Sequence, residues 1–77
     1  MNPTQQKFQE FILERVQESK SEEARDLLYE SFQKQKEHSF DRAYLLSFIP
    51  RMKALLKPEH IDEVETIMNQ FGSKFTR

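Results

Sequence analysis

Residues 39–56 read SFDRAYLLSFIPRMKALL, and this stretch decides the fold. Eleven of the seventeen residues from position 40 to position 56 are apolar. On a helix, at about 100° per residue, they leave only a narrow polar strip that holds Arg42 and Lys53. A helix that is apolar nearly all round is stable only at the centre of a bundle, where other helices cover most of its circumference. The stretch therefore predicts an all-α fold organised around a buried helix.

Pro50 interrupts this pattern. Proline has no N–H to donate to the carbonyl of Leu46 and its ring crowds that carbonyl, at a cost of about 3 kcal/mol in a helix interior. Because apolar residues continue on both sides of Pro50, we expect a kink or a break there that the packing tolerates. Ser39 is the expected N-cap of this helix. The chain then forms four helices, or five short ones if Pro50 ends the third.

Three other segments have helical periodicity. The first begins at Asn2 and Pro3, which suit the start of a helix. The second follows residues 19–22, which fit a capping box, and the last begins at Pro58. Their apolar stripes are formed by Phe8, Phe11, Ile12 and Val16, by Ala24, Leu27, Leu28 and Phe32, and by Ile61, Val64, Ile67, Met68 and Phe71.

The length and the connections define one domain. A chain of 77 residues forms a single domain, and its short connections predict a compact bundle of antiparallel neighbours. Gly72 is expected to end the last helix in the left-handed conformation, so that residues 73–77 form a polar C-terminal tail. Residues 8–16 and 24–32 space their apolar side chains alike, which two similar amphipathic helices produce by chance, so we infer no repeat.

The composition excludes several classes of protein. Without cysteine the chain forms no disulfide or thiolate zinc site, and its single glycine excludes glycine-rich phosphate loops. The N-terminal residues lack the pattern of a secretory signal, and no apolar run approaches the roughly 18 residues of a membrane span. We therefore expect a cytoplasmic protein without a membrane segment.

The sequence offers no convincing site for chemistry. His38 and His60 lie near carboxylates, but bundle metal sites use inward-facing carboxylates and Glu-x-x-His pairs, which this chain lacks. Its serines occur mostly at expected helix caps, and no nucleophile motif is present. We expect no metal, no cofactor and no enzymatic activity.

Charge is distributed unevenly along the chain. Residues 1–33 carry a net charge of −3, residues 34–57 carry +4 and residues 58–77 carry −2. The basic segment could bind nucleic acid, although a net charge of −1 for the whole chain argues against it. We favour pairing of these cations with acidic faces of neighbouring helices. The residues concerned are Lys34, Lys36, Arg42, Arg51, Lys53 and Lys57.

Some apolar residues exceed the needs of one core. Leu13, Tyr29 and Phe75 lie off the main apolar stripes, and some of the apolar surface of the central helix would stay exposed in a monomer of four short helices. Exposed apolar patches mark sites of association. The sequence therefore predicts a small helical protein that binds another protein or itself, with a homodimer as one form of the latter. The alternative is a nucleic-acid-associated protein that uses the basic segment 34–57.

Overall fold

The structure is a computed structural model that describes residues 3–75. Four α-helices account for most of this range, and two of them are preceded by a turn of 3-10 helix. The elements are α1 (Pro3–Leu13), η1 (Glu18–Lys20), α2 (Ser21–Lys36), α3 (Arg42–Lys53), η2 (Pro58–His60) and α4 (Ile61–Phe75). No strand occurs within residues 3–75. The predicted all-α bundle is confirmed, with four helices rather than five.

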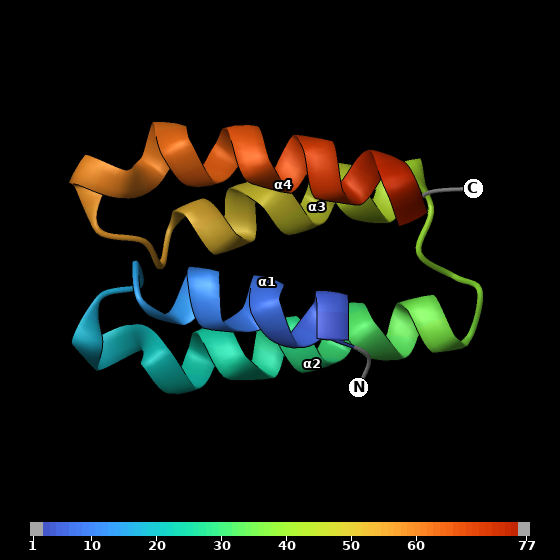
Figure 1. Cartoon of the computed structure of the whole chain (residues 1–77), viewed down its shortest axis with the longest axis horizontal. Helices are drawn as coiled ribbons and strands as arrows, with labels where there is room; N and C mark the ends of the chain where they lie inside the picture. Colours follow the sequence, from blue (N-terminus) through green and yellow to red (C-terminus); the bar gives the residue numbers. More distant parts are fainter. Residues whose placement is uncertain (1–2, 76–77) are drawn as a thin grey trace.

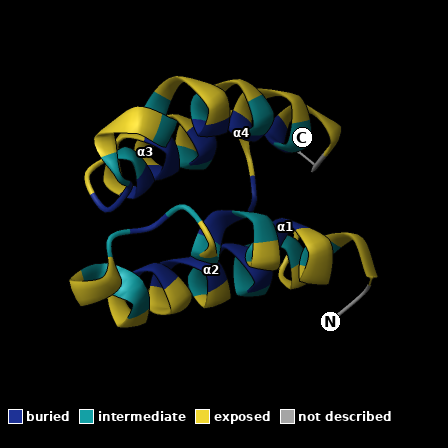
Figure 2. Cartoon of the chain, turned by 60° about the vertical axis from the view of Figure 1, so that its left-hand side comes forward, coloured by how far each residue is buried: buried dark blue, intermediate teal, exposed yellow. Residues whose placement is uncertain are grey.

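The helices form two hairpins that pack face to face. In Figure 1 the pair α1 and α2 lies below the pair α3 and α4. The connections within the two hairpins lie at one end of the bundle, and the linker between the hairpins lies at the other. Buried residues of each hairpin face the other hairpin, while exposed residues line the outside (Figure 2). The core is therefore the layer between the two hairpins.

Sixteen apolar side chains make up this core, and each helix supplies some of them. They are Phe8, Ile12, Val16, Ala24, Leu27, Leu28, Phe32, Phe40, Leu45, Phe48, Ile49, Met52, Leu55, Leu56, Val64 and Met68. The burial of these large side chains from water is the main force that holds the hairpins together.

The two hairpins repeat the same local structure with a spacing of 40 residues. Residues 11–20 and 51–60 have the same sequence of helix, turn, bridge and 3-10 conformations. Six apolar positions recur at this spacing, namely 8, 12, 16, 24, 27 and 28 in the first half and 48, 52, 56, 64, 67 and 68 in the second. Only a few residues are identical, Phe8 and Phe48 among them. The sequence analysis compared successive helices, residues 8–16 with 24–32, and did not consider this spacing.

Equivalent residues of the two connections meet at the centre of the repeat. Val16 and Leu56 form an isolated antiparallel bridge. The N–H of Gln17 donates to the carbonyl of Leu55, and the N–H of Lys57 donates to that of Arg15, both at 3.0 Å. Because 15 corresponds to 55 and 17 to 57, the two bonds exchange under a twofold rotation. The bridge thus joins the hairpins by a pair of equivalent hydrogen bonds.

Several expected helix ends are wrong. Neither Ser19 nor Ser21 caps α2, because η1 leads directly into it and Ser21 Oγ donates to the carbonyl of Glu18. Asp41, not Ser39, is the N-cap of α3, and its carboxylate accepts from the N–H of Tyr44 at 2.8 Å. Asp41 lies next to the first helical residue, which places its carboxylate over the free N–H groups.

Both ends of the last helix, α4, also differ from expectation. Pro58 begins η2, and α4 itself begins at Ile61. Gly72 does not end α4 and has no positive φ. It lies within the helix, buried against Leu45, so its missing side chain permits close packing rather than a turn. The first three residues of the expected tail continue α4, and the last two, like the expected cap Asn2, lie outside the described residues.

The linker between the hairpins begins with a left-handed residue. His38 has a φ of 61°. The N–H of His38 donates to the carbonyl of Gln35 at 3.2 Å, and the N–H of Ser39 donates to that of Lys34 at 2.8 Å. This is the Schellman pattern of a helix C-terminus, in which glycine usually holds the left-handed position. It turns the chain so that the next residue, Phe40, enters the core.

Candidate interaction surface

One side of α3 is exposed and carries no charge. The central helix was expected to be covered over most of its circumference, and in the bundle it keeps one open side, on which Leu46 is 62% exposed. This surface, the α3 face, consists of five exposed residues spaced at i, i+3, i+4, i+7 and i+11, which places them along one line of a helix. They are Ala43, Leu46, Ser47, Pro50 and Ala54.

The repeat supplies an internal comparison for this surface. The corresponding line on α1, 40 residues earlier, is exposed as well, and it forms the α1 face. Its residues are Pro3, Gln6, Lys7, Glu10 and Glu14. Two helices in equivalent positions thus present different surfaces, since α1 has the polar side expected of a helix in water, whereas α3 does not.

Pro50 belongs to the α3 face. α3 runs through Pro50 without a break, so the expected alternative of two short helices is wrong. Pro50 is exposed, and its missing N–H leaves the carbonyl of Leu46 on the side of the helix that faces water. A kink at this position stays a prediction.

Basic residues border the α3 face. Between Arg42 and Lys53 the helix contains no carboxylate. Arg51 donates to both carboxylate oxygens of Glu30, at 2.9 and 3.3 Å. Lys53 donates to Glu65 at 3.0 Å. Arg42 is exposed and makes no ion pair with any residue from 3 to 75.

The pairing of Arg51 belongs to a polar cluster between α2 and α3. Tyr44 donates its hydroxyl hydrogen to Glu30 at 2.7 Å. Hydrogen bonds from Arg51 and from Tyr44 hold the pKa of the Glu30 carboxyl below its usual value. Burial, together with the bond to Glu30, raises the pKa of Tyr44. The cluster fixes α2 beside α3 at the edge of the α3 face.

The surface predicted from surplus apolar residues is scattered in the structure. Leu13 is partly buried against the core. Tyr29 is 64% exposed on α2, next to the exposed charged residues Arg25 and Asp26. The side chain of Phe75 lies outside the described residues. A single exposed aromatic side chain among charges needs no special explanation, so the structure gives more weight to the α3 face, whose residues were not among the three named.

The basic segment divides into paired and unpaired cations. Arg51 and Lys53 pair with acidic residues of neighbouring helices, as the sequence suggested. The ammonium of Lys34 lies 5.9 Å from the centre of the Tyr44 ring. Lys36 and Arg42 are exposed and Lys57 is half-buried. Within the part of the chain that the structure describes, these last three have no ion-pair partner.

The two histidines lie apart from one another. His38 occupies the linker, and the Nδ1 of His60 lies 3.4 Å from a carboxylate oxygen of Glu63. The same oxygen of Glu63 accepts from Nε of Arg15 at 2.6 Å. Among residues 3–75 no group of three or more potential metal-binding side chains gathers in one place. In the same range no helix has both the length and the apolar character of a membrane span.

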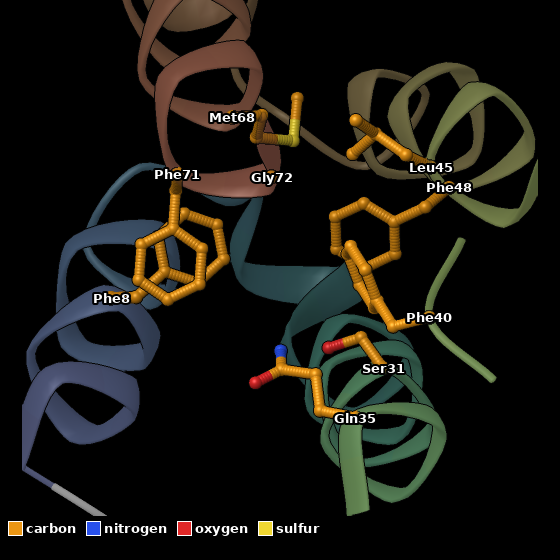
Figure 3. A pocket seen from close by; sticks show the side chains of 9 residues that line it. All are labelled: Phe8, Ser31, Gln35, Phe40, Leu45, Phe48, Met68, Phe71 and Gly72. Atoms are coloured by element: carbon orange, nitrogen blue, oxygen red, sulfur yellow. The ribbon is translucent and has the colours of Figure 1, made fainter. Parts of the chain in front are cut away.

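The end of the bundle at which the linker joins the two hairpins, called the open end below, contains a small apolar cavity (Figure 3). Its volume is about 10 Å³, enough for one water molecule at most. The rings of Phe8 and Phe71 stack on one side of it, with centroids 4.2 Å apart, and Phe40 and Phe48 lie opposite them. The cavity is too small for a cofactor or substrate.

Comparisons with known proteins give no further guide. The sequence matches no family model, and neither the curated proteins nor the solved structures contain a match.

Proposed function

We propose that this chain acts by binding another protein, and that the α3 face is the contact surface. The observation that carries the proposal is the difference between two equivalent helices. At the positions where α1 exposes Gln6, Lys7, Glu10 and Glu14, α3 exposes Leu46, Ser47, Pro50 and Ala54.

The composition of the α3 face does not serve the stability of the free protein. An exposed leucine gains little from folding, because most of its surface stays in water. Proline within a helix costs stability, about 3 kcal/mol in an ordinary interior position. Local choices that oppose the fold are expected at functional sites. A partner that covers Leu46 and Pro50 supplies the missing reason for both.

A binding role also agrees with the size of the protein. Among the hollows of the described residues are an apolar cavity of about 10 Å³ and two open surface hollows of about 280 and 450 Å³, and none of these three gathers an acid, a base and a nucleophile. We therefore propose a binding protein and not an enzyme. The expectation of a cytoplasmic location forms part of the same proposal.

Site-specific photo-crosslinking tests this function. In cells that make the protein, a photoreactive amino acid replaces Ser47 on the α3 face. As a matched control, the same amino acid replaces the equivalent Lys7 on the α1 face. We expect a defined crosslinked product from position 47 and none from position 7. Equal labelling from both positions, or none from either, contradicts the proposal.

A variant that copies one face onto the other gives the second control. The α1-like variant carries Leu46→Gln, Ser47→Lys, Pro50→Glu and Ala54→Glu, which are the residues of α1 at those positions. With the photoreactive group moved to Ala43 in both backgrounds, the crosslinked product should disappear in the variant. A product with twice the mass of the chain would identify the partner as a second copy.

A further inference from the structure

We infer that the α3 face takes an amphipathic helix of another protein, with carboxylates on both sides of its apolar stripe. The inference rests on the proposed function and specifies the partner. Two features of the α3 face support it: its shape and the sign of the charge around it.

The shape of the α3 face suits a helix. From Ala43 to Ala54 the face is about 16 Å long, at a rise of 1.5 Å per residue. Leu46 is its one large side chain, and the residues beside it, Ala43, Ser47 and Ala54, have small side chains. Helices pack by placing ridges of side chains between the ridges of a neighbouring helix, and small side chains permit a close approach. Binding of a partner by β-strand addition needs the free edge of a sheet, and residues 3–75 contain no sheet.

The charge around the α3 face favours an acidic partner. At the borders of the face, α3 carries the unpaired Arg42 as well as Arg51 and Lys53, which pair with Glu30 and Glu65; at the positions of the last two, α1 has Phe11 and Leu13. On the face itself, α3 lacks the two carboxylates, Glu10 and Glu14, and the one cation, Lys7, that α1 carries. Complementary charges of this kind select partners and direct their approach.

Arg42 is the clearest of these cations. It occupies the first turn of α3, where the helix dipole disfavours positive charge, and it has no ion-pair partner among the described residues. Nothing in the fold explains it, whereas a carboxylate on a partner helix would pair with it at the edge of the α3 face.

A second copy of the chain fits this surface less well. Packing α3 against α3 of another copy would bring together two helices whose cations are Arg42, Arg51 and Lys53. We therefore expect the free protein to be monomeric.

Two designed peptides provide the test. Both are helical, about 18 residues long, with the same apolar stripe of leucine and alanine; glutamate flanks the stripe in one and lysine in the other. Fluorescence anisotropy of the labelled peptides measures their binding to the full chain. We expect the glutamate peptide to bind at least about tenfold more tightly, with an advantage that shrinks as salt screens the charges.

Variants connect that binding to the α3 face. The α1-like variant should lose binding of the glutamate peptide, and Arg42→Gln should weaken it severalfold. Lys7→Gln on the α1 face is the matched control, and it should bind as the parent does. Equal binding of the two peptides, no binding of either at about 1 mM, or unchanged binding by the α1-like variant overturns the inference.

The outcomes separate this inference from the proposed function. A defined crosslink from position 47 together with equal binding of the two peptides would keep the binding role and reject the acidic helix. Sedimentation of the parent identifies the other occupant: a dimer that the α1-like variant abolishes would place a second copy on the α3 face. An absent crosslink would instead reject the proposed function itself.

Discussion

Gly72 of α4 lies so close to Leu45 of α3 that a methyl group on Gly72 would collide with Cδ1 of Leu45 and lie 2.8 Å from its Cδ2. Both residues are buried and both border the apolar cavity at the open end of the bundle. The glycine therefore sets how closely α3 and α4 approach each other at that end.

We predict that Gly72→Ala lowers the free energy of unfolding in the parent but raises it when Leu45 is shortened. In the parent, overpacking of about 1–3 kcal/mol outweighs the gain of up to about 1 kcal/mol from better helix propensity. With Leu45→Ala the collision is gone, so the same substitution should stabilise. A double-mutant cycle by chemical denaturation measures the coupling. Destabilisation by the same amount in both backgrounds would show that the contact does not limit packing.

The bridge between the hairpins permits a test of single backbone hydrogen bonds. Gln17 and Lys57 have φ values of −59° and −65°, which proline adopts without strain. Lys57→Pro should therefore remove only the N–H that bonds Arg15, and cost about 1 kcal/mol relative to Lys57→Ala. If the two connections are equivalent, Gln17→Pro compared with Gln17→Ala should give a similar loss. Clearly unequal losses in thermal unfolding would contradict that equivalence.

The Glu30 cluster predicts how stability depends on pH. Because the pKa of Glu30 is lowered in the folded state, its contribution is present above the unfolded pKa of about 4.3 and is lost as pH falls through the lowered folded value. Glu30 and Arg51 are 40% and 50% exposed, so the contribution should be no more than about 1 kcal/mol. Glu30→Gln should therefore lose less stability than the parent between about pH 5 and pH 2. If the free energy of unfolding falls equally in the two proteins as the pH is lowered, Glu30 makes no such contribution.

The fold could be predicted from the sequence because its signals are local. Apolar periodicity and short connections identified four helices, and the charges near the ends of α2 agreed with its direction. The ends of the helices depend on competition between neighbours. Asp41, not Ser39, directly precedes the first helical residue and caps α3, and Phe40, which lies between the two, is buried in the core. Gly72 stays helical because of a contact with Leu45 that the sequence does not show.

The sequence indicated that part of the central helix would be exposed, but the residues of the candidate site could not be named, because exposure depends on which helices are neighbours. Residues 39–56 predict a helix apolar on nearly all sides, but a four-helix bundle leaves each helix an open side. Which residues occupy that side follows from the direction in which Leu45, Phe48 and Met52 point into the core. The repeat identifies the α3 face as unusual, and its spacing of 40 residues was visible only after the hairpins were defined.

The basic segment should not bind nucleic acid under physiological conditions. Two of its six cations are paired with carboxylates, and a chain with a net charge of −1 repels a polyanion. Binding through phosphate contacts would weaken steeply with salt, because such contacts release counterions. We expect no binding of a duplex of about 20 base pairs, of DNA or RNA, at ~150 mM salt. A dissociation constant at or below about 1 µM there would favour the nucleic-acid alternative.

The last prediction concerns the stability of the α1-like variant. Replacing Pro50 restores an N–H for the carbonyl of Leu46, but the helix already continues through this position, so Pro50→Ala should stabilise by less than the full interior cost of about 3 kcal/mol. Leu46→Gln, on an exposed side chain, should change the free energy of unfolding by no more than about 0.5 kcal/mol. The α1-like variant should therefore be more stable than the parent while its crosslinking and its binding of the glutamate peptide are lost. Loss of stability in the variant would show that the α3 face supports the fold, and the argument that a partner explains Leu46 and Pro50 would then fail.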